Sequence, residues 1–410
     1  MQGITQDVRD ILRGFKMTVD FNKLIFAFVG IVFSIIWLLV VLAFLSALGL
    51  IDTSPFVIIN HVLISPRLGL SYLFSAFLSV MVTVDWAEYL GLVVLVVGLL
   101  AIWSIIGGAI TRLAALEFAR DEKIGFKEAL SFASKKFWSY FWSPLTPALG
   151  VLFFVACNII GGLFGQIKYI GEIAVAIGFP LAILSGFLII FIGIIGVIGF
   201  FLMFPTISAE GSDAFDAMSR AYSYVISKPK HFISLFLGII ICGTIFAIFV
   251  SLAACLIMQT SFYTVGFGMG EKFESIKAVV VGGAYGKAQM ASLGLLSMKF
   301  TALMLMIYIV LIKVAVGSLV VAFAGSASTI AYFLLRKDVD GTDINDVYIE
   351  EKEGEEEKRE EEKEETKVET EKVETKATEG KQTAPEEKPK EKPKEKPPEE
   401  PGESSPEKQT

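Results

Sequence analysis

The sequence contains little cysteine and little histidine. Its 410 residues include 3 cysteines and 2 histidines. Cys157, Cys242 and Cys255 all fall inside apolar stretches, where packing as a small side chain is their ordinary role, so we predict no disulfide framework. His61 and His231 are far apart in the chain, and neither has a second histidine or cysteine at the spacing of metal ligands. We therefore predict no metal site, no cofactor and no histidine-based catalysis.

Charge is nearly missing from six long stretches. The mean hydropathy is +0.62 and 54% of the residues are hydrophobic, which is more apolar side chain than a soluble domain of this length buries. A helix needs about 20 apolar residues to cross the roughly 30 Å of hydrocarbon in a bilayer. The stretches of that length are 24–50, 90–111, 145–165, 180–207, 232–257 and 301–335. They predict an all-α fold, a polytopic membrane bundle of six transmembrane helices. Apolar residues 54–85 either cap the outer face or form a shallow re-entrant piece, and the cap is favoured because a re-entrant loop must bury its open backbone against protein.

Acidic residues gather at the C-terminus. Residues 336–410 carry 16 basic and 27 acidic side chains, while the whole chain has a net charge of −7, so the remainder is mildly basic. This segment cannot bury enough apolar surface to offset its ordering entropy, although Glu and Lys at helical spacing give part of it a coiled-coil-like pattern. We predict a cytoplasmic amphipathic segment at 1–23, a six-span membrane domain at 24–335 and a disordered charged cytoplasmic tail at 336–410. The tail is either an inert spacer or an arm for a cytoplasmic protein partner.

Basic residues mark alternate loops. Lys and Arg near span ends favour the cytoplasmic side. They occur before the first span, after the second, after the fourth and after the sixth: Arg9, Arg13, Lys16, Lys23, Arg112, Arg120, Lys123, Lys127, Lys135, Lys136, Arg220, Lys228, Lys230, Arg336 and Lys337. The pattern predicts a multi-pass protein of the bacterial inner membrane with both termini in the cytoplasm. The first span is too long for the apolar region of a signal peptide, so we interpret it as an uncleaved anchor.

Two basic loops share a short pattern at an offset of 88 residues. The matched pairs are Glu122 and Glu210, Glu128 and Asp216, Ala129 and Ala217, Leu130 and Met218, Ser131 and Ser219, and Ala133 and Ala221. Each copy has an apolar and a polar helical face, which is typical of an amphipathic helix at a membrane interface. Because the period covers two spans, it predicts a parallel internal repeat. The alternative is two unrelated amphipathic elbows.

A resemblance rests on two strings. The first includes GGAITR at 107–112, ARDEK at 119–123 and EAL at 128–130, and the second is YFLLRKDVDGTD at 332–343. Together they resemble an uncharacterised family of polytopic membrane proteins from planctomycete-like bacteria. The acidic-Ala-Leu loop is more distantly similar to the membrane domains of glycerophosphodiester phosphodiesterases. The resemblance implies a membrane fold and no known activity, and no phosphodiesterase catalytic domain accompanies it.

Three basic residues are the candidate site residues. Arg112 and Arg120 could contact lipid headgroups or another anion, because cationic side chains at the interface attract anionic lipid. Lys313 lies inside an apolar span, where a charge is costly and often functional. Counting about 20 residues back from Leu335 places Lys313 near the outer interface, where its ammonium can reach the headgroups. A deeper Lys313 would need a partner such as Glu172.

Two functions remain open. The first is a non-enzymatic membrane protein that organises lipids or protein partners at the inner face, because polar residues inside the spans are few. The second is a transporter or channel for a small solute, with Asn158, Ser185, Lys313 and Thr329 as its sparse polar groups. The Gly-rich run 282–288 departs from a phosphate-binding loop at Val281 and Ala288. No catalytic pair is visible and no nucleic-acid partner is expected, so we predict that the protein is not an enzyme.

Overall fold

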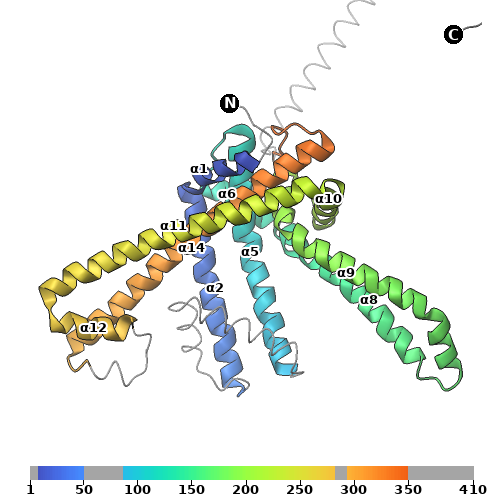
Figure 1. Ribbon diagram of the computed structural model, residues 1–410, viewed down its shortest axis with the longest axis horizontal. Coiled ribbons are helices and arrows are strands. Elements are labelled where there is room, and N and C mark those ends of the chain that lie inside the picture. Colours follow the sequence, from blue (N-terminus) through green and yellow to red (C-terminus); the bar gives the residue numbers. More distant parts are fainter. Residues whose placement is uncertain (1–7, 50–85, 282–292, 350–410) are drawn as a thin grey trace, which may run out of the picture. The chain divides into compact units, whose positions relative to one another are not determined.

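The computed structural model describes residues 8–49, 86–281 and 293–349, and these are almost entirely helical (Figure 1). The chain begins with a 3-10 helix, η1 (Val8–Leu12), and a short helix, α1 (Arg13–Thr18). Six helices are long and apolar enough to cross a membrane: α2 (Phe21–Ala47), α5 (Trp86–Arg120), α8 (Leu145–Phe164), α9 (Ile170–Glu210), α11 (Pro229–Met269) and α14 (Leu296–Asp340). The predicted all-α bundle with six spans is confirmed.

Consecutive long helices pack as pairs, α2 with α5, α8 with α9 and α11 with α14. In the first pair, a methyl group added at Gly98 would overlap the ring of Trp37, whose indole N–H donates to the Leu95 carbonyl at 3.2 Å. In the second, Gly196 lies against Pro147 in the same way. Close approach at small residues is the usual way in which helices associate in lipid, where no hydrophobic force drives them together.

In the described ranges, four short helices connect the long ones. They are α6 (Phe126–Lys135), α7 (Phe137–Trp142), α10 (Ala214–Ser227) and α12 (Glu271–Val281). The chain turns sharply before α6 and before α10, because Asp121 and Gly211 adopt left-handed conformations with φ of 59° and 63°. In α10, the Asp213 side chain accepts the Asp216 amide at 2.9 Å and caps the helix start.

The predicted amphipathic helices are α6 and α10. The alanines that match in the two copies, Ala129 with Ala217 and Ala133 with Ala221, are all fully buried. However, Glu122 lies in the loop beyond α5, whereas its match Glu210 is the last residue of α9. The two copies therefore agree within the short helices and differ by two residues in the preceding turn, and the internal repeat stays a prediction.

Most of the buried core lies at one end of the spans, and a smaller buried cluster joins α12 to α11 and α14. We call the end with most of the core the basic end: it is formed by the helix ends at Phe21, Arg120, Leu145, Glu210, Pro229 and Asp340, where the basic residues gather. Nearly all buried residues of α9 lie between Ile195 and Ala209, and those of α14 are densest between Ser318 and Arg336. Towards the opposite end, which we call the far end, large apolar side chains such as Ile177 and Leu181 are exposed. Exposed apolar surface of this kind suits hydrocarbon as its solvent.

This burial pattern accounts for the length of the helices. At 1.5 Å per residue, the 45 residues of α14 extend about 67 Å, roughly twice the thickness of the hydrocarbon. Outside the densely buried part, about 22 residues of α14 and about 25 of α9 remain, each close to one bilayer thickness. The predicted spans 180–207 and 301–335 therefore include residues of the core.

The described structure continues past residue 336, where the sequence predicts that the tail begins. Helix α14 continues to Asp340 and ends at Gly341, which has a φ of 68°. The residues that follow form an ordered segment, 341–349, which we call the strap, and its Ile344 and Val347 side chains are buried. The compact unit ends at Ile349. The composition of 336–349 resembles the acidic tail, but these two apolar side chains pack within the core.

Several predictions concern residues outside the described ranges. They are the first seven residues of the amphipathic N-terminal segment, the outer cap at 54–85 with His61, the Gly-rich run at 282–288, and the tail from residue 350 onwards.

The predicted orientation can be tested by cysteine labelling. In a variant without the three native cysteines, we expect Lys168→Cys and Lys272→Cys to react with a membrane-impermeant thiol reagent in intact cells. We expect Lys127→Cys and Ser219→Cys to react only after the membrane is opened. All four positions are exposed or half-buried, and an odd number of spans separates the two pairs. Labelling of the second pair in intact cells would contradict the orientation.

Candidate functional site

The last turn of α9 is where the other elements of the basic end meet. Four consecutive residues, Ser208, Ala209, Glu210 and Gly211, are bonded to α5, α7, α10, α14, the strap and Lys136. We call these four residues the α9 junction. Such a density of polar contacts at one helix end makes it the strongest candidate for a functional site among the described residues.

Ser208 joins α9 to α5 and α7. Its hydroxyl lies 2.6 Å from the hydroxyl of Thr111 and 2.8 Å from that of Tyr140. Its carbonyl accepts a hydrogen bond of 2.7 Å from Nη1 of Arg112. The Arg112 guanidinium also lies 4.2 Å from the centre of the Phe132 ring, a cation–π distance. Three segments that are distant in sequence thus share one serine.

Arg112, predicted as a lipid or anion contact, is only 4% exposed. Its contacts with Ser208 and Phe132 are with protein, and burial of an arginine is tolerable only when its charge is so engaged. The structure therefore places Arg112 inside the core, where it acts as a cross-link between helices.

Tyr140 is the buried residue that fixes α7. A methyl group on Gly108 would lie 2.6 Å from the Tyr140 ring, so only glycine fits there, and the Phe204 ring meets it edge-on at 5.1 Å. Burial raises the pKa of the Tyr140 hydroxyl above its ordinary value. The hydroxyl therefore stays neutral and remains available for its hydrogen bond to Ser208.

Glu210 joins α9 to α10 and α14. Its carboxylate lies 2.7 Å from Nε of Arg220 and 3.1 Å from Nε of Arg336, and the Tyr332 hydroxyl donates to it. The Glu210 and Arg336 side chains are each 9% exposed. Because two cations and a hydroxyl surround one carboxylate, its negative charge is fully engaged within the protein.

The carboxylate of Asp340, at the end of α14, also binds residues of α10. Asp340 accepts a hydrogen bond of 2.5 Å from the Tyr224 hydroxyl and lies 3.5 Å from Nη1 of Arg220. Burial, together with the adjacent Asp340 carboxylate, raises the pKa of the Tyr224 hydroxyl. Tyr224 therefore remains a hydrogen-bond donor, and α10 is fastened to both long helices.

The strap closes over the junction. The Tyr348 amide donates to the Ala209 carbonyl at 2.8 Å, and Arg336 donates to the Asp346 carbonyl at 2.6 Å. Gly211 is required here, because its φ is positive and a methyl group would lie 2.6 Å from the Tyr348 ring. The Lys136 ammonium donates to the Gly211 carbonyl and lies 5.8 Å from the centre of the Tyr348 ring.

Arg120, the second predicted lipid or anion contact, also binds the strap. Its guanidinium donates to the carbonyls of Asn345 at 3.3 Å and Val347 at 3.4 Å. Both predicted arginines thus make intramolecular bonds to backbone carbonyls. Sequence reasoning attributed their charge to the membrane, because nothing in the sequence shows that carbonyls about 100 to 230 residues away lie beside them.

Lys23 and Glu117 form a buried ion pair that the sequence did not predict. Lys23 is fully buried and pairs with Glu117 of α5, and its ammonium also donates to the Met17 carbonyl at 3.1 Å. The pair links the start of α2 to α5. Lys23 was counted only as a topology charge, and no spacing signal relates it to a residue 94 positions away.

Lys313 lies on α14 and is half-buried. It is one helical turn from Gly317, which lies beside Ile31 of α2 at the edge of the core. The count from Leu335 includes the core residues of α14 in the membrane span, and the depth of Lys313 in the membrane stays a prediction. Glu172, the conceivable partner, is exposed near the start of α9 at the far end.

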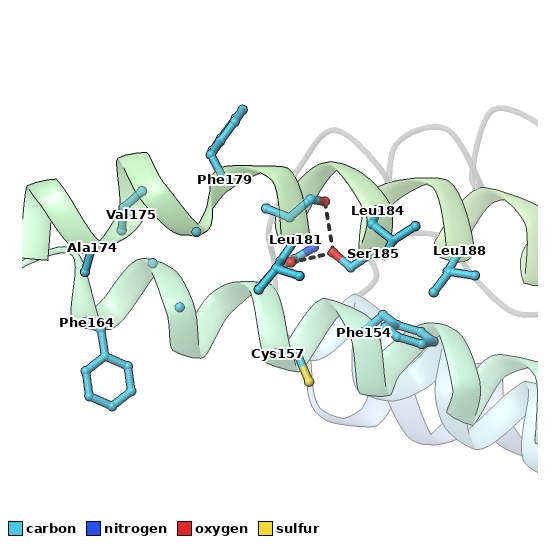
Figure 2. Close-up of a pocket in the computed structure, with 15 residues that line it drawn as sticks. Phe154, Cys157, Phe164, Ala174, Val175, Phe179, Leu181, Leu184, Ser185 and Leu188 are labelled. Carbon is cyan, nitrogen blue, oxygen red and sulfur yellow. Dashed lines mark hydrogen bonds between the residues drawn. The ribbon is translucent and has the colours of Figure 1, made fainter.

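A groove between α8 and α9 contains a polar pair (Figure 2). Its volume is about 630 Å³ and its lining is mainly apolar. The Ser185 hydroxyl points towards α8, where it donates to Oδ1 of Asn158 at 2.6 Å. Thr329, another of the polar residues considered for transport, is instead buried in the core, where it donates to the Gly325 carbonyl at 2.7 Å. The structure thus unites two of the four candidates and leaves Thr329 apart from them.

Removing the shared serine hydroxyl tests the junction. We expect Ser208→Ala to lower the free energy of unfolding by about 1–3 kcal/mol, because the buried Tyr140 hydroxyl loses its partner. Reversible unfolding in mixed micelles measures this change. Thr146→Ala removes an exposed hydroxyl bonded to the Trp142 carbonyl and should change the free energy by less than about 0.5 kcal/mol. Equal effects of the two substitutions would contradict the role of Ser208.

Removing the Arg120 side chain tests the strap. We expect Arg120→Ala to speed hydrogen exchange at the Tyr348 amide about tenfold, because two bonds that hold the strap are lost. Lys123→Ala, an exposed charge in the adjacent loop, is the matched control and should leave the exchange rate unchanged. An unchanged rate in Arg120→Ala would show that the strap is held without Arg120.

Comparisons with protein-family models, with curated proteins and with solved structures found no match. The resemblance of 107–130 and 332–343 to an uncharacterised membrane family stays a prediction. The function must therefore be argued from the α9 junction and its surroundings.

Proposed function

We propose that this protein is a non-enzymatic integral membrane protein that organises lipids or protein partners at the inner face of a bacterial inner membrane. In this proposal both termini are cytoplasmic, so the basic end is the cytoplasmic end. Six membrane-spanning helices imply contact with lipid.

One observation carries the proposal. The polar and charged side chains of the basic end bind one another across helices, as Arg112 does with Ser208 and Glu210 does with Arg220 and Arg336. A catalytic or transport site needs polar groups that point into a space where a substrate can sit. The α9 junction uses its polar groups to hold five elements together, and this supports a structural role for the basic end.

The surface of the basic end favours partners at the interface between membrane and water. The outward faces of α6 and α10 expose Lys127, Ser131, Ser219 and Ser223, while their alanines face the core. Helices with this pattern suit the headgroup region. The acidic tail follows the strap in sequence, and its charge suits an arm for a cytoplasmic protein partner.

The groove between α8 and α9 favours a second candidate function. A transporter or channel for a small solute needs polar groups at membrane depth, and the Asn158–Ser185 pair supplies two of them within a space of about 630 Å³. The largely apolar lining is a reason to rank this function second.

The two functions differ in what reconstituted vesicles should show. We expect the full chain to increase self-quenching of a fluorescent anionic lipid, since organising lipids raises their local density. We expect glycerol and potassium to enter at the rate of protein-free vesicles. Entry above that rate, abolished by Ser185→Ala, would overturn the proposal in favour of transport. Unchanged self-quenching would contradict the organisation of lipids. If the full chain also recruited no cytoplasmic protein through its tail, the proposal as a whole would be wrong.

A further inference from the structure

Five of the six residues of α7, FWSYFW, are aromatic, and one of these rings is buried while four lie further out. Tyr140 is buried against Gly108 and bonded to Ser208. Trp138 is 65% exposed and Trp142 is 42% exposed, while Phe137 and Phe141 are partly buried. A soluble surface rarely exposes two tryptophans on one short helix, so this face requires a cover.

The four outer rings form a continuous surface. Phe137 lies 5.2 Å from Trp138 and 5.7 Å from Phe141, ring centre to ring centre. Phe141 lies 5.9 Å from Trp138 and 5.7 Å from Trp142. These are ordinary distances for interacting aromatic pairs. We call Phe137, Trp138, Phe141 and Trp142 the aromatic platform.

Chain connectivity fixes the depth of this platform. Trp142 is three residues before Leu145, where the span α8 begins, so Trp142 lies within about 10 Å of the start of that span and near the boundary between hydrocarbon and headgroups. Tryptophan is enriched at that boundary, because its ring is apolar and its N–H seeks a polar partner. The occupant that this position supplies is therefore phospholipid.

The charge beside the platform selects the kind of phospholipid. Helix α6 precedes α7 directly, and its outward face exposes Lys127 and Lys135. Arg112 and Arg120, the residues first expected to attract anions, are bonded to backbone carbonyls instead. Lys127 and Lys135 are therefore exposed basic residues of the helix that directly precedes the platform.

We propose that the aromatic platform, with Lys127 and Lys135, binds the headgroup region of anionic phospholipid in the leaflet at the basic end. This inference rests on the proposed function, because it specifies the lipid class and the residues through which the protein would organise lipids. Tyr140 is the positioning residue, because its bond to Ser208 holds the rings in a fixed place relative to the core.

Tryptophan fluorescence tests the depth of the platform. The chain has 5 tryptophans, so Trp37, Trp86 and Trp103→Phe leaves only Trp138 and Trp142 as reporters. In vesicles, we expect phospholipid brominated at carbons 6 and 7 to quench these two at least about twofold more than phospholipid brominated at carbons 11 and 12. The matched control keeps only Trp103, which lies within span α5 and should show the smaller ratio.

Headgroup selectivity is measured with the same variant. Brominated anionic phospholipid should quench more than its zwitterionic counterpart, and Lys127→Gln and Lys135→Gln should each reduce the relative association about fivefold. Lys272→Gln, a lysine of α12 beyond the far end of α11, is the matched control and should change nothing.

Absence of quenching, or stronger quenching by the deeper bromines, would overturn the assignment of the platform to the headgroups. Equal quenching by anionic and zwitterionic lipid would overturn the role of the lysines. If the tryptophan variants do not fold, a fluorescent label at Ser139→Cys in the cysteine-free background reports the same depth. Lipid self-quenching that persists without platform insertion would refute this inference alone, whereas insertion without self-quenching would refute lipid organisation alone.

Discussion

The arrangement of the basic end depends on pairing the polar groups of a single helix turn. Helix α9 ends in a region that is too apolar to leave a carboxylate or a carbonyl without a partner, because an unpaired buried polar group costs several kcal/mol. Each residue of the α9 junction meets this requirement with a different neighbour: Ser208 with α5 and α7, Ala209 with the strap, Glu210 with α10 and α14, and Gly211 with Lys136. Apolar contact alone would allow one pair of helices to slide against another in lipid. The junction fixes their register, because hydrogen bonds and ion pairs are directional.

The sequence predicted the spans well and the core poorly, and the reason is physical. Residence in hydrocarbon depends on composition and length alone, so 24–50 and 145–165 coincide closely with α2 and α8. The core at the basic end is as apolar as the spans, and hydropathy therefore does not distinguish Ser318–Arg336 of α14 from a lipid-facing segment. The distinction appears in small residues such as Ala322, Ser326 and Ala327, which permit close packing and are fully or nearly fully buried.

The junction itself could not be predicted from single-sequence patterns. Arg112 and Ser208 are 96 residues apart, and Glu210 and Tyr332 are 122 apart. Helical spacing relates only residues three or four apart, so it identifies the faces of α6 and α10 but not their partners. The strap was missed for a different reason. Its acidic composition resembles the tail, and a compositional argument averages over Ile344 and Val347, the two side chains that bury it.

The strap and α7 are held by adjacent residues of α9. Tyr348 binds the carbonyl of Ala209, and Tyr140 binds the hydroxyl of Ser208, the preceding residue. Two adjacent residues of α9 thus hold the element that leads into the tail and the element that carries the aromatic platform. A helix turn is stiff, because its backbone bonds and the packing around it leave one arrangement. A force that displaced this turn through the strap would therefore act on α7 as well.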